Sequence, residues 1–370
     1  MKQQNLHIAF ASLGLVLILL LGGCTADSTH EAEQTSMREL RFVLGGHNYS
    51  DVTPAAPHRA LPSGYVVYSD LATKIPEDEA ALRCYMTQGD EAKFQGNVTY
   101  RSGTWVSKIP LDNGDYYVYG LMPGTEASKV ESMTALSGNY NNGAVMNIKG
   151  LSAVTTSDVC AIVGVKGSGS ASNTDITTSG IQLGSFKYNA EEGTDVYLLI
   201  DHLYAAIQLN MNINEDYNAL RHIRLTKLTL QSSTVNTVNM TVTMTANETN
   251  TSPLTATPPT VTAAATGEGT DIEIYKGEEQ ELQVYNKLVF LACTAPIETN
   301  TQFVMKTTYN VYDRNDNLIR KNCTAENVLT LPTGGLTRGQ KYTFNLTVNP
   351  TYLYVLSDPD LDNPTVTISN

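Results

Sequence analysis

The sequence predicts an all-β protein built from β-sandwiches, and three observations support this. Short segments that mix β-branched and aromatic residues with alternating polar ones recur along the chain, among them TWVSKIPL, DYYVYGLM and YTFNLTV. Turn-forming residues separate them, as in Asp112-Asn113-Gly114. Helix signals are sparse: KIPEDEAALRCY (74–85), with acids at its start, and NEDYNALRH (214–222) are the two short candidates for a helix or turn. Regularly spaced short strands of this kind are typical of sandwiches.

The N-terminus has the pattern of an export signal. Lys2 is followed by an apolar run over about 8–21, which is shorter than the roughly 20 residues a membrane-spanning helix needs. The run ends at Leu21-Gly22-Gly23-Cys24, which resembles a bacterial lipobox, and the resemblance implies that Cys24 is acylated in a Gram-negative envelope. We therefore expect a signal peptide over 1–24 and a flexible polar tether over 25–38.

The first predicted strand covers 39–46. Leu40, Phe42 and Leu44 recur at every second position, which places them on one face. A loop is expected from Gly45 to Gly64, because it contains several prolines.

Two strand-rich halves follow, and a charged turn at AEEGTD suggests a boundary near residue 193. We predict an N-terminal sandwich over 39–193 and a C-terminal sandwich over 194–370. GVKGSGSASNT (164–174) is expected to be a loop. YLLIDHLYAAIQLNMNI (197–213) is either one strand buried on both faces or two strands in succession.

Composition and charge limit the fold and the partners that the chain can have. The chain has 370 residues, 41% of them hydrophobic, which supports real cores. Its net charge is −13 and it has no long basic run, so nucleic acid is not an expected partner. After Cys24, the cysteines at 84, 160, 293 and 323 fit no CxxC pattern. We expect buried thiols, with disulfides left open because an exported protein permits them.

The sequence offers no set of catalytic residues. His202 and His222 lack zinc-site spacing, and no nucleophile motif accompanies His202, which is interpreted as a histidine at a strand edge. The run from Gly164 to Gly169 lacks the ending of a phosphate loop. Asp358, Asp360 and Asp362 favour a solvated turn over a cation site. We predict no enzyme, no cofactor and no metal.

Together, the lipobox, the tether, the first strand, the arginine-containing loop and the two β-rich halves resemble the fimbrillin family, the type V pilins of Bacteroidales. The stretches DYYVYGLMPG and GLTRGQKYTFNLTV are similar to segments of that family. The resemblance implies two tandem transthyretin-like β-sandwich domains. It also implies donor-strand exchange: a surface protease specific for arginine cuts after the first strand, the strand departs, and a neighbour's C-terminal strand replaces it.

The family pattern assigns roles to particular residues. The expected cleavage falls between Arg59 and Ala60 in PAAPHRALPSG. Arg38 and Arg41 are alternative cleavage sites. The simpler interpretation of Arg59 is a surface arginine that is not cleaved. Leu40, Phe42 and Leu44 belong to the displaced strand. The donor strand carries Leu353 and Val355, or Val366 and Ile368, unless these form ordinary last strands of the second domain.

The resemblance also implies location and partners. The precursor is expected on the outer membrane, held by its N-terminal lipid, and later in a fimbrium with other copies or related pilin subunits. The other partners are the arginine-specific protease and a host or bacterial receptor for adhesion, whose identity stays open. Whether the subunit belongs to the stalk, the tip or the anchor of the fimbria also stays open. The alternative function is a surface glycan-binding lipoprotein of a polysaccharide-uptake system, which would also be lipidated and rich in tyrosine.

Overall fold

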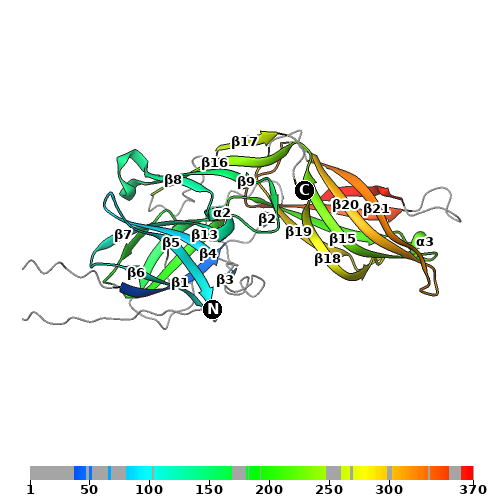
Figure 1. Ribbon diagram of the computed structural model, residues 1–370, viewed down its shortest axis with the longest axis horizontal. Coiled ribbons are helices and arrows are strands. Elements are labelled where there is room, and N and C mark those ends of the chain that lie inside the picture. The colour runs from blue at the N-terminus through cyan, green and yellow to red at the C-terminus, as the bar shows by residue number, and fades with distance from the viewer. Residues whose placement is uncertain are drawn as a thin grey trace, which may run out of the picture. The chain divides into compact units, whose positions relative to one another are not determined.

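In the computed structural model, the described residues are 37–46, 50–51, 66–67, 81–101, 104–168, 181, 183–191, 193–246, 260–266, 270–297, 302–331, 334–349 and 360–369. All of them belong to one compact unit, 36–370. They form four sheets and very little helix, so the prediction of an all-β, largely antiparallel sandwich-type fold is confirmed (Figure 1). Within these residues, no helix has the length and apolar character needed to cross a bilayer.

The largest sheet holds nine strands and contains the N-terminal strand. In sheet order the strands are β11 (Cys160–Ser168), β13 (Asp195–His202), β1 (Met37–Gly46), β6 (Thr104–Pro110), β5 (Glu91–Arg101), β4 (Ala81–Gln88), β7 (Asp115–Met122) and β12 (Lys187–Asn189), with β3 (Val66–Val67) beside β1. β11 also pairs with β7 through Cys160 and Ala161. The sheet therefore curls until strands from its two ends meet, and it encloses a core.

Three smaller sheets complete the described fold. One contains β10 (Val154–Thr155), β19 (Leu288–Thr294), β14 (Ala205–Ile213), β22 (Gln340–Asn349), β2 (Ser50–Asp51) and β23 (Asp360–Ser369). A second runs β18 (Ile272–Glu281), β15 (His222–Ser232), β20 (Gln302–Tyr312), β21 (Leu318–Thr330). The third runs β17 (Thr260–Thr266), β16 (Val235–Thr245), β9 (Gly143–Ser152), β8 (Val130–Ala135).

The helical segments among the described residues are one turn each. They are α2 (Gly124–Ala127), α3 (Glu215–Asn218) and the 3-10 turns Leu136–Gly138 and Tyr140–Asn142. Asn214 caps α3, because its side-chain oxygen accepts from the backbone N–H groups of Asp216 and Tyr217. The candidate helix at 214–222 is thus present as a single turn.

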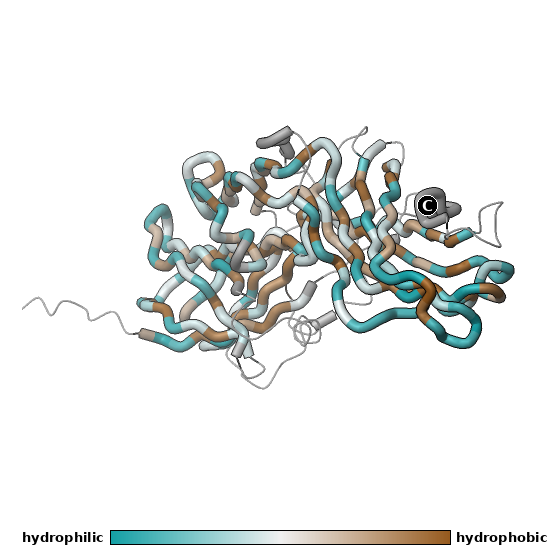
Figure 2. Tube along the Cα trace, turned by 45° about the vertical axis from the view of Figure 1, so that its right-hand side comes forward, coloured by the Kyte–Doolittle hydropathy of each residue, from teal (hydrophilic) through white to brown (hydrophobic). Residues whose placement is uncertain are grey.

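Hydrophobic and hydrophilic residues alternate along many of the strands (Figure 2). In β22, for example, every second side chain from Tyr342 to Val348 is buried. Such alternation gives each sheet one apolar face, and burying these faces together forms the core.

Some expectations need correction. Residues 81–85, placed in a candidate helix or turn, begin β4, where Leu82 and Cys84 are fully buried. Residues 164–168, expected in a loop, continue β11, whose pairing with β13 shifts register between Ile162 and Gly164. A bulge of this kind lets a glycine-containing segment stay in a sheet.

The long apolar stretch at 197–213 forms two strands, β13 and β14, which settles the alternative left open by the sequence. β13 lies beyond the predicted boundary at 193, yet it pairs with β1 and β11. The division into 39–193 and 194–370 stays a prediction, and this pairing places β13 in the same sheet as strands from the predicted N-terminal half.

Candidate functional site

The N-terminal strand β1 joins two strands of the largest sheet. Its first part, from Met37 to Phe42, pairs antiparallel with β6. Its second part, from Arg41 to Gly46, pairs parallel with β13. β1 therefore connects β6 to β13, and without it neither strand would keep its partner on that side.

The three residues assigned from the sequence to the inner face of β1 are buried. Leu40 is 0% exposed, and Phe42 and Leu44 are each 2% exposed. By contrast, Met37 at the start of the strand is 62% exposed. At about 1.5–3 kcal/mol for each buried side chain, the three together contribute about 5–9 kcal/mol of hydrophobic stabilisation.

Phe42 occupies the centre of this arrangement. It lies opposite Trp105 in β6 and opposite Val196 in β13, and all three side chains are buried. Directly paired residues project to the same face of a sheet, so these side chains belong to one strip of the core. Leu44 lies opposite the buried Leu198 in the same way. The apolar strip of β1 therefore fits a slot between β6 and β13.

An ion pair fixes the register of β1 against β13. The Arg41 guanidinium donates from Nε to Oδ1 of Asp195 at 2.9 Å and from Nη2 to Oδ2 at 2.6 Å. The Asp195 side chain is 3% exposed and that of Arg41 is 33% exposed. The hydrogen bond to this carboxylate raises the pKa of Arg41, so the guanidinium stays charged. Bidentate pairs are geometrically specific, and a slip of one residue would break this one.

Both alternative cleavage arginines are held by the fold. Arg41 lies within β1 and is bound to Asp195. Arg38 donates to the carbonyl of Ala190 at 2.8 Å and to Oδ1 of Asn113 at 2.6 Å. A protease binds its substrate as an accessible extended segment, so arginines engaged in a sheet are poor substrates.

The predicted cleavage pair, Arg59 and Ala60, lies outside the described residues, and so does the lipidation residue Cys24. The short strands on either side of the cleavage pair are described. β2 pairs with β22 at Gln340 and Lys341, and β3 pairs with the end of β1. A cut at 59–60 would thus fall between two paired segments and would separate β1 from the rest of the chain.

The C-terminal strand β23 pairs with β22 as an antiparallel neighbour. Val366 lies opposite Leu346 and Ile368 opposite Phe344. Both partners in β22 are buried. Leu353 and Val355, the other donor candidates, lie outside the described residues. Asp360 and Asp362 belong to β23, so the turn expected there is wrong for these two residues.

The cysteines after Cys24 remain thiols, and Cys84, Cys160 and Cys293 are buried as expected. Burial raises the pKa of Cys84 to about 12. A thiol of this kind stays protonated and unreactive under ordinary conditions.

One group of neighbouring residues has no counterpart in the sequence motifs. His202, interpreted as a histidine at a strand edge, lies beside Cys160 and Asp158 at the start of the β11–β13 pairing. The spacing of Asp158 and Cys160 was visible in the chain. Their meeting with His202 depends on strand register, which no local pattern reveals.

No model of a protein family matches the chain, and no curated protein is significantly similar to it. Solved structures are similar at low identity. A candidate cell adhesion protein from Bacteroides fragilis is 13% identical, with 90% of this chain and 97% of that chain covered and a TM-score of 0.46. The fimbrial anchor protein Mfa2 from Porphyromonas gingivalis is 11% identical over 89% of this chain and 96% of its own, with a TM-score of 0.27.

The tip fimbrial protein Mfa3 from Porphyromonas gingivalis, with a C-terminal truncation, is 8% identical. The similarity covers 90% of this chain and 99% of that chain, with a TM-score of 0.32. At TM-scores below 0.5, these similarities do not assign a function to the chain.

Proposed function

We propose that the protein is a structural subunit of a cell-surface fimbria involved in adhesion. In this proposal it belongs to the fimbrillin family and polymerises by donor-strand exchange. The observation that carries the proposal is the placement of β1. The first strand of the described chain joins β6 to β13, and its three apolar side chains are 0–2% exposed.

The position of β1 in the chain means that one cut can remove the strand. Residues 1–36 lie on its N-terminal side, so a cut at Arg59–Ala60 would leave β1 attached to the leader end only. The released piece would keep the lipid on Cys24, while the rest of the subunit would lose its membrane anchor. One cleavage would therefore free the subunit and open its slot at the same time.

An empty slot is expected to refill. Loss of β1 would expose the apolar faces around Trp105 and Val196 and leave unpaired backbone along β6 and β13. Exposed edges of this kind recruit another strand. Because about 5–9 kcal/mol of apolar burial is lost with β1, a replacement strand of the same pattern would bind tightly.

β23 is the donor we propose. Like β1 it is ten residues long, and its end, TVTIS, has apolar residues at every second position, as β1 has at Leu40, Phe42 and Leu44. β22 is the strand with which it pairs. In this proposal, β23 of a neighbouring subunit leaves its edge of the sheet and places Val366 and Ile368 where Phe42 and Leu44 had been. Alternatively, Leu353 and Val355, from the segment before β23, take those positions.

The remaining parts of the proposal rest on the resemblance to the fimbrillin family and on the lipobox. The precursor travels to the outer membrane as a lipoprotein acylated at Cys24, an arginine-specific surface protease cuts after Arg59, and the subunit enters a fimbrium. The two halves are transthyretin-like sandwiches. Related pilin subunits are the direct partners, and the protein acts by assembly and adhesion, with no catalytic role.

Treatment of the purified precursor with an arginine-specific protease tests this function. We expect one cut after Arg59, loss of the N-terminal fragment, and a ladder of SDS-resistant multimers on a gel. The Arg59→Ala variant should stay a monomer. Arg314→Ala, which removes an exposed arginine elsewhere, should behave like the unchanged protein.

Three results would argue against the proposal. One is complete cleavage that leaves only monomers, and another is a ladder that forms equally well with Arg59→Ala. The third is a chain that keeps its first strand after protease treatment and shifts on polysaccharide gels. That last result would favour the glycan-binding lipoprotein.

A further inference from the structure

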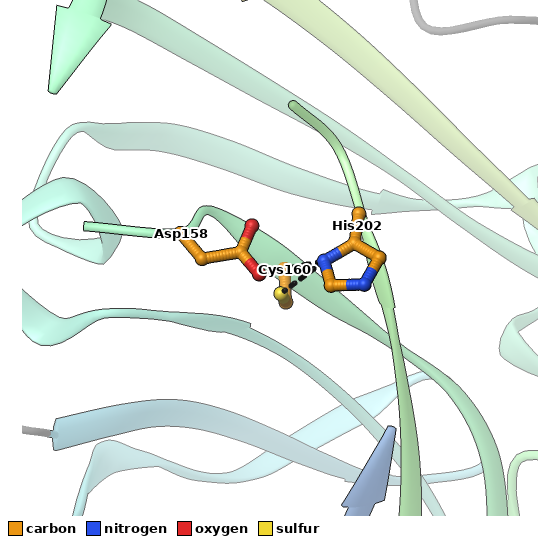
Figure 3. A group of neighbouring side chains, drawn as sticks. All are labelled: Asp158, Cys160 and His202. Carbon is orange, nitrogen blue, oxygen red and sulfur yellow. Dashed lines mark hydrogen bonds and ion pairs between the residues drawn. The ribbon is translucent and has the colours of Figure 1, made fainter. Parts of the chain in front are cut away.

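Asp158, Cys160 and His202 form a compact group at one end of the largest sheet (Figure 3). Nδ1 of His202 lies 2.6 Å from Oδ2 of Asp158 and 3.7 Å from Sγ of Cys160. Cys160 and His202 face each other across the β11–β13 ladder. Asp158 precedes Cys160 by two residues. The three side chains therefore meet because of strand register.

We propose that this group is a binding site for a zinc ion, held by Sγ of Cys160, Nδ1 of His202 and a carboxylate oxygen of Asp158. This proposal does not depend on the fimbrial function. Thiolate, imidazole and carboxylate are the three ligand types that zinc accepts, whereas calcium and magnesium take oxygen ligands. Three protein ligands leave a fourth tetrahedral position for water.

The distances fit a tetrahedral centre. With metal–ligand bonds of about 2.0–2.3 Å, neighbouring ligand atoms are roughly 3.3–3.8 Å apart. The separation of 3.7 Å between Nδ1 and Sγ already falls in this range. The carboxylate would move away from Nδ1 by less than about 1 Å. Asp158 lies before the first residue of β11 and its side chain is 23% exposed, so it has room to turn.

A catalytic triad does not explain the group. In a triad the acid and the nucleophile contact different nitrogens of the imidazole, so that one nitrogen is oriented and the other takes the proton. Here the carboxylate and the thiol both face Nδ1. The three donor atoms lie within 4.8 Å of one another, as close as ligands around one ion need to be.

Burial determines the protonation state of the cysteine when no ion is bound. Cys160 is 1% exposed, and the His202 side chain is 10% exposed. Burial, followed by the charge of Asp158, raises the pKa of Cys160, so without a metal the sulfur keeps its proton. On binding, zinc would take the sulfur lone pair and the thiol proton would pass to solvent. Zinc uptake should therefore release protons and strengthen as pH rises.

The test uses the untagged full chain, stripped of metal with a chelator and titrated with Zn²⁺ by calorimetry and with Co²⁺ by absorption spectroscopy. We expect one ion per chain, a rise in melting temperature, and a thiolate-to-cobalt charge-transfer band. Cys160→Ser should abolish that band, and His202→Gln and Asp158→Asn should weaken binding at least about tenfold. Asp158→Asn changes a partly exposed residue, so it keeps the test usable if a buried variant fails to fold.

His222→Gln and Cys323→Ser are the matched controls. His222 also has an acidic neighbour, with Nδ1 3.1 Å from Oδ1 of Asp316, and Cys323 is a partly buried thiol. Both variants should bind as the unchanged protein does. The proposal is overturned if the full chain binds no ion, if the cobalt complex lacks a thiolate band, or if the controls lose binding as much as the ligand variants.

Discussion

At the scale of single residues, the side chains of β1 divide into buried ones and exposed ones. Phe42 is buried between Trp105 and Val196, whereas Glu39, three residues earlier, is exposed. The strand therefore has one face that contributes to stability and one that solvent reaches. Substitutions on the two faces should have different effects.

Phe42→Ala should lower the free energy of unfolding of the uncleaved chain by about 3–5 kcal/mol, because it removes a buried ring and leaves a cavity. Glu39→Ala, on the exposed face, should change it by less than about 0.5 kcal/mol. Urea unfolding followed by tryptophan fluorescence measures both, since the chain has one tryptophan, Trp105, opposite Phe42. Equal effects of the two substitutions would contradict the burial of this face.

The ion pair of Arg41 and Asp195 should contribute to the free energy of unfolding. Arg41→Met should destabilise the chain by about 1–3 kcal/mol, because it leaves the buried Asp195 carboxylate without its guanidinium partner. In the double variant with Asp195→Leu, part of this loss should be recovered. A double-mutant cycle in urea gives the coupling. Strictly additive effects would show that the pair does not hold β1 in register.

At the scale of elements, the sequence predicts that a segment forms a strand better than it predicts which strands pair with it. The alternation of Leu40, Phe42 and Leu44 predicts a strand with one buried face, because side chains alternate along any strand. The partners of that strand, β6 and β13, lie far along the chain and pair with it in different directions. No local pattern encodes such a choice, so the slot itself could not be predicted.

The mistaken elements have similar causes. Acids at 77–79 suggested a helix start, but residues from Ala81 onward join a sheet, where Leu82 and Cys84 face the core. Tertiary packing outweighs such weak local signals. The group of Asp158, Cys160 and His202 was missed because two strands must first align in one register.

The fluorescence of Trp105 should report the removal and replacement of β1. After cleavage and removal of the first strand, Trp105 should become exposed to water, and its fluorescence should shift to longer wavelength. A synthetic peptide MRELRFVLGG should bind in the slot and reverse the shift. A peptide with Leu40, Phe42 and Leu44 each replaced by Asn should fail, because it offers no apolar face.

The peptide experiment has a clear contrary result. Equal reversal by both peptides would mean that backbone pairing alone fills the slot. An unchanged Trp105 signal after the first strand has left would mean that β1 does not cover this part of the core.

At the scale of the whole molecule, the proposed function needs both a slot and a donor strand in the same chain. β1 lies within the largest sheet, and β23 pairs with β22 in a different one. The antiparallel pairing of Val366 with Leu346 and of Ile368 with Phe344 belongs to a continuous ladder over 365–369, and the register shifts between there and Asp360. Subunits that exchange such strands head to tail form open, growing chains.

The cryo-electron microscopy structure of fibres grown from the cleaved protein tests this central claim most directly, because it shows which strand lies between β6 and β13. We predict that a C-terminal segment of the neighbouring subunit, residues 351–369, occupies that position and that residues 37–46 are absent from the fibre. Residues 37–46 of the same chain still lying between β6 and β13 in an assembled fibre would contradict assembly by strand replacement.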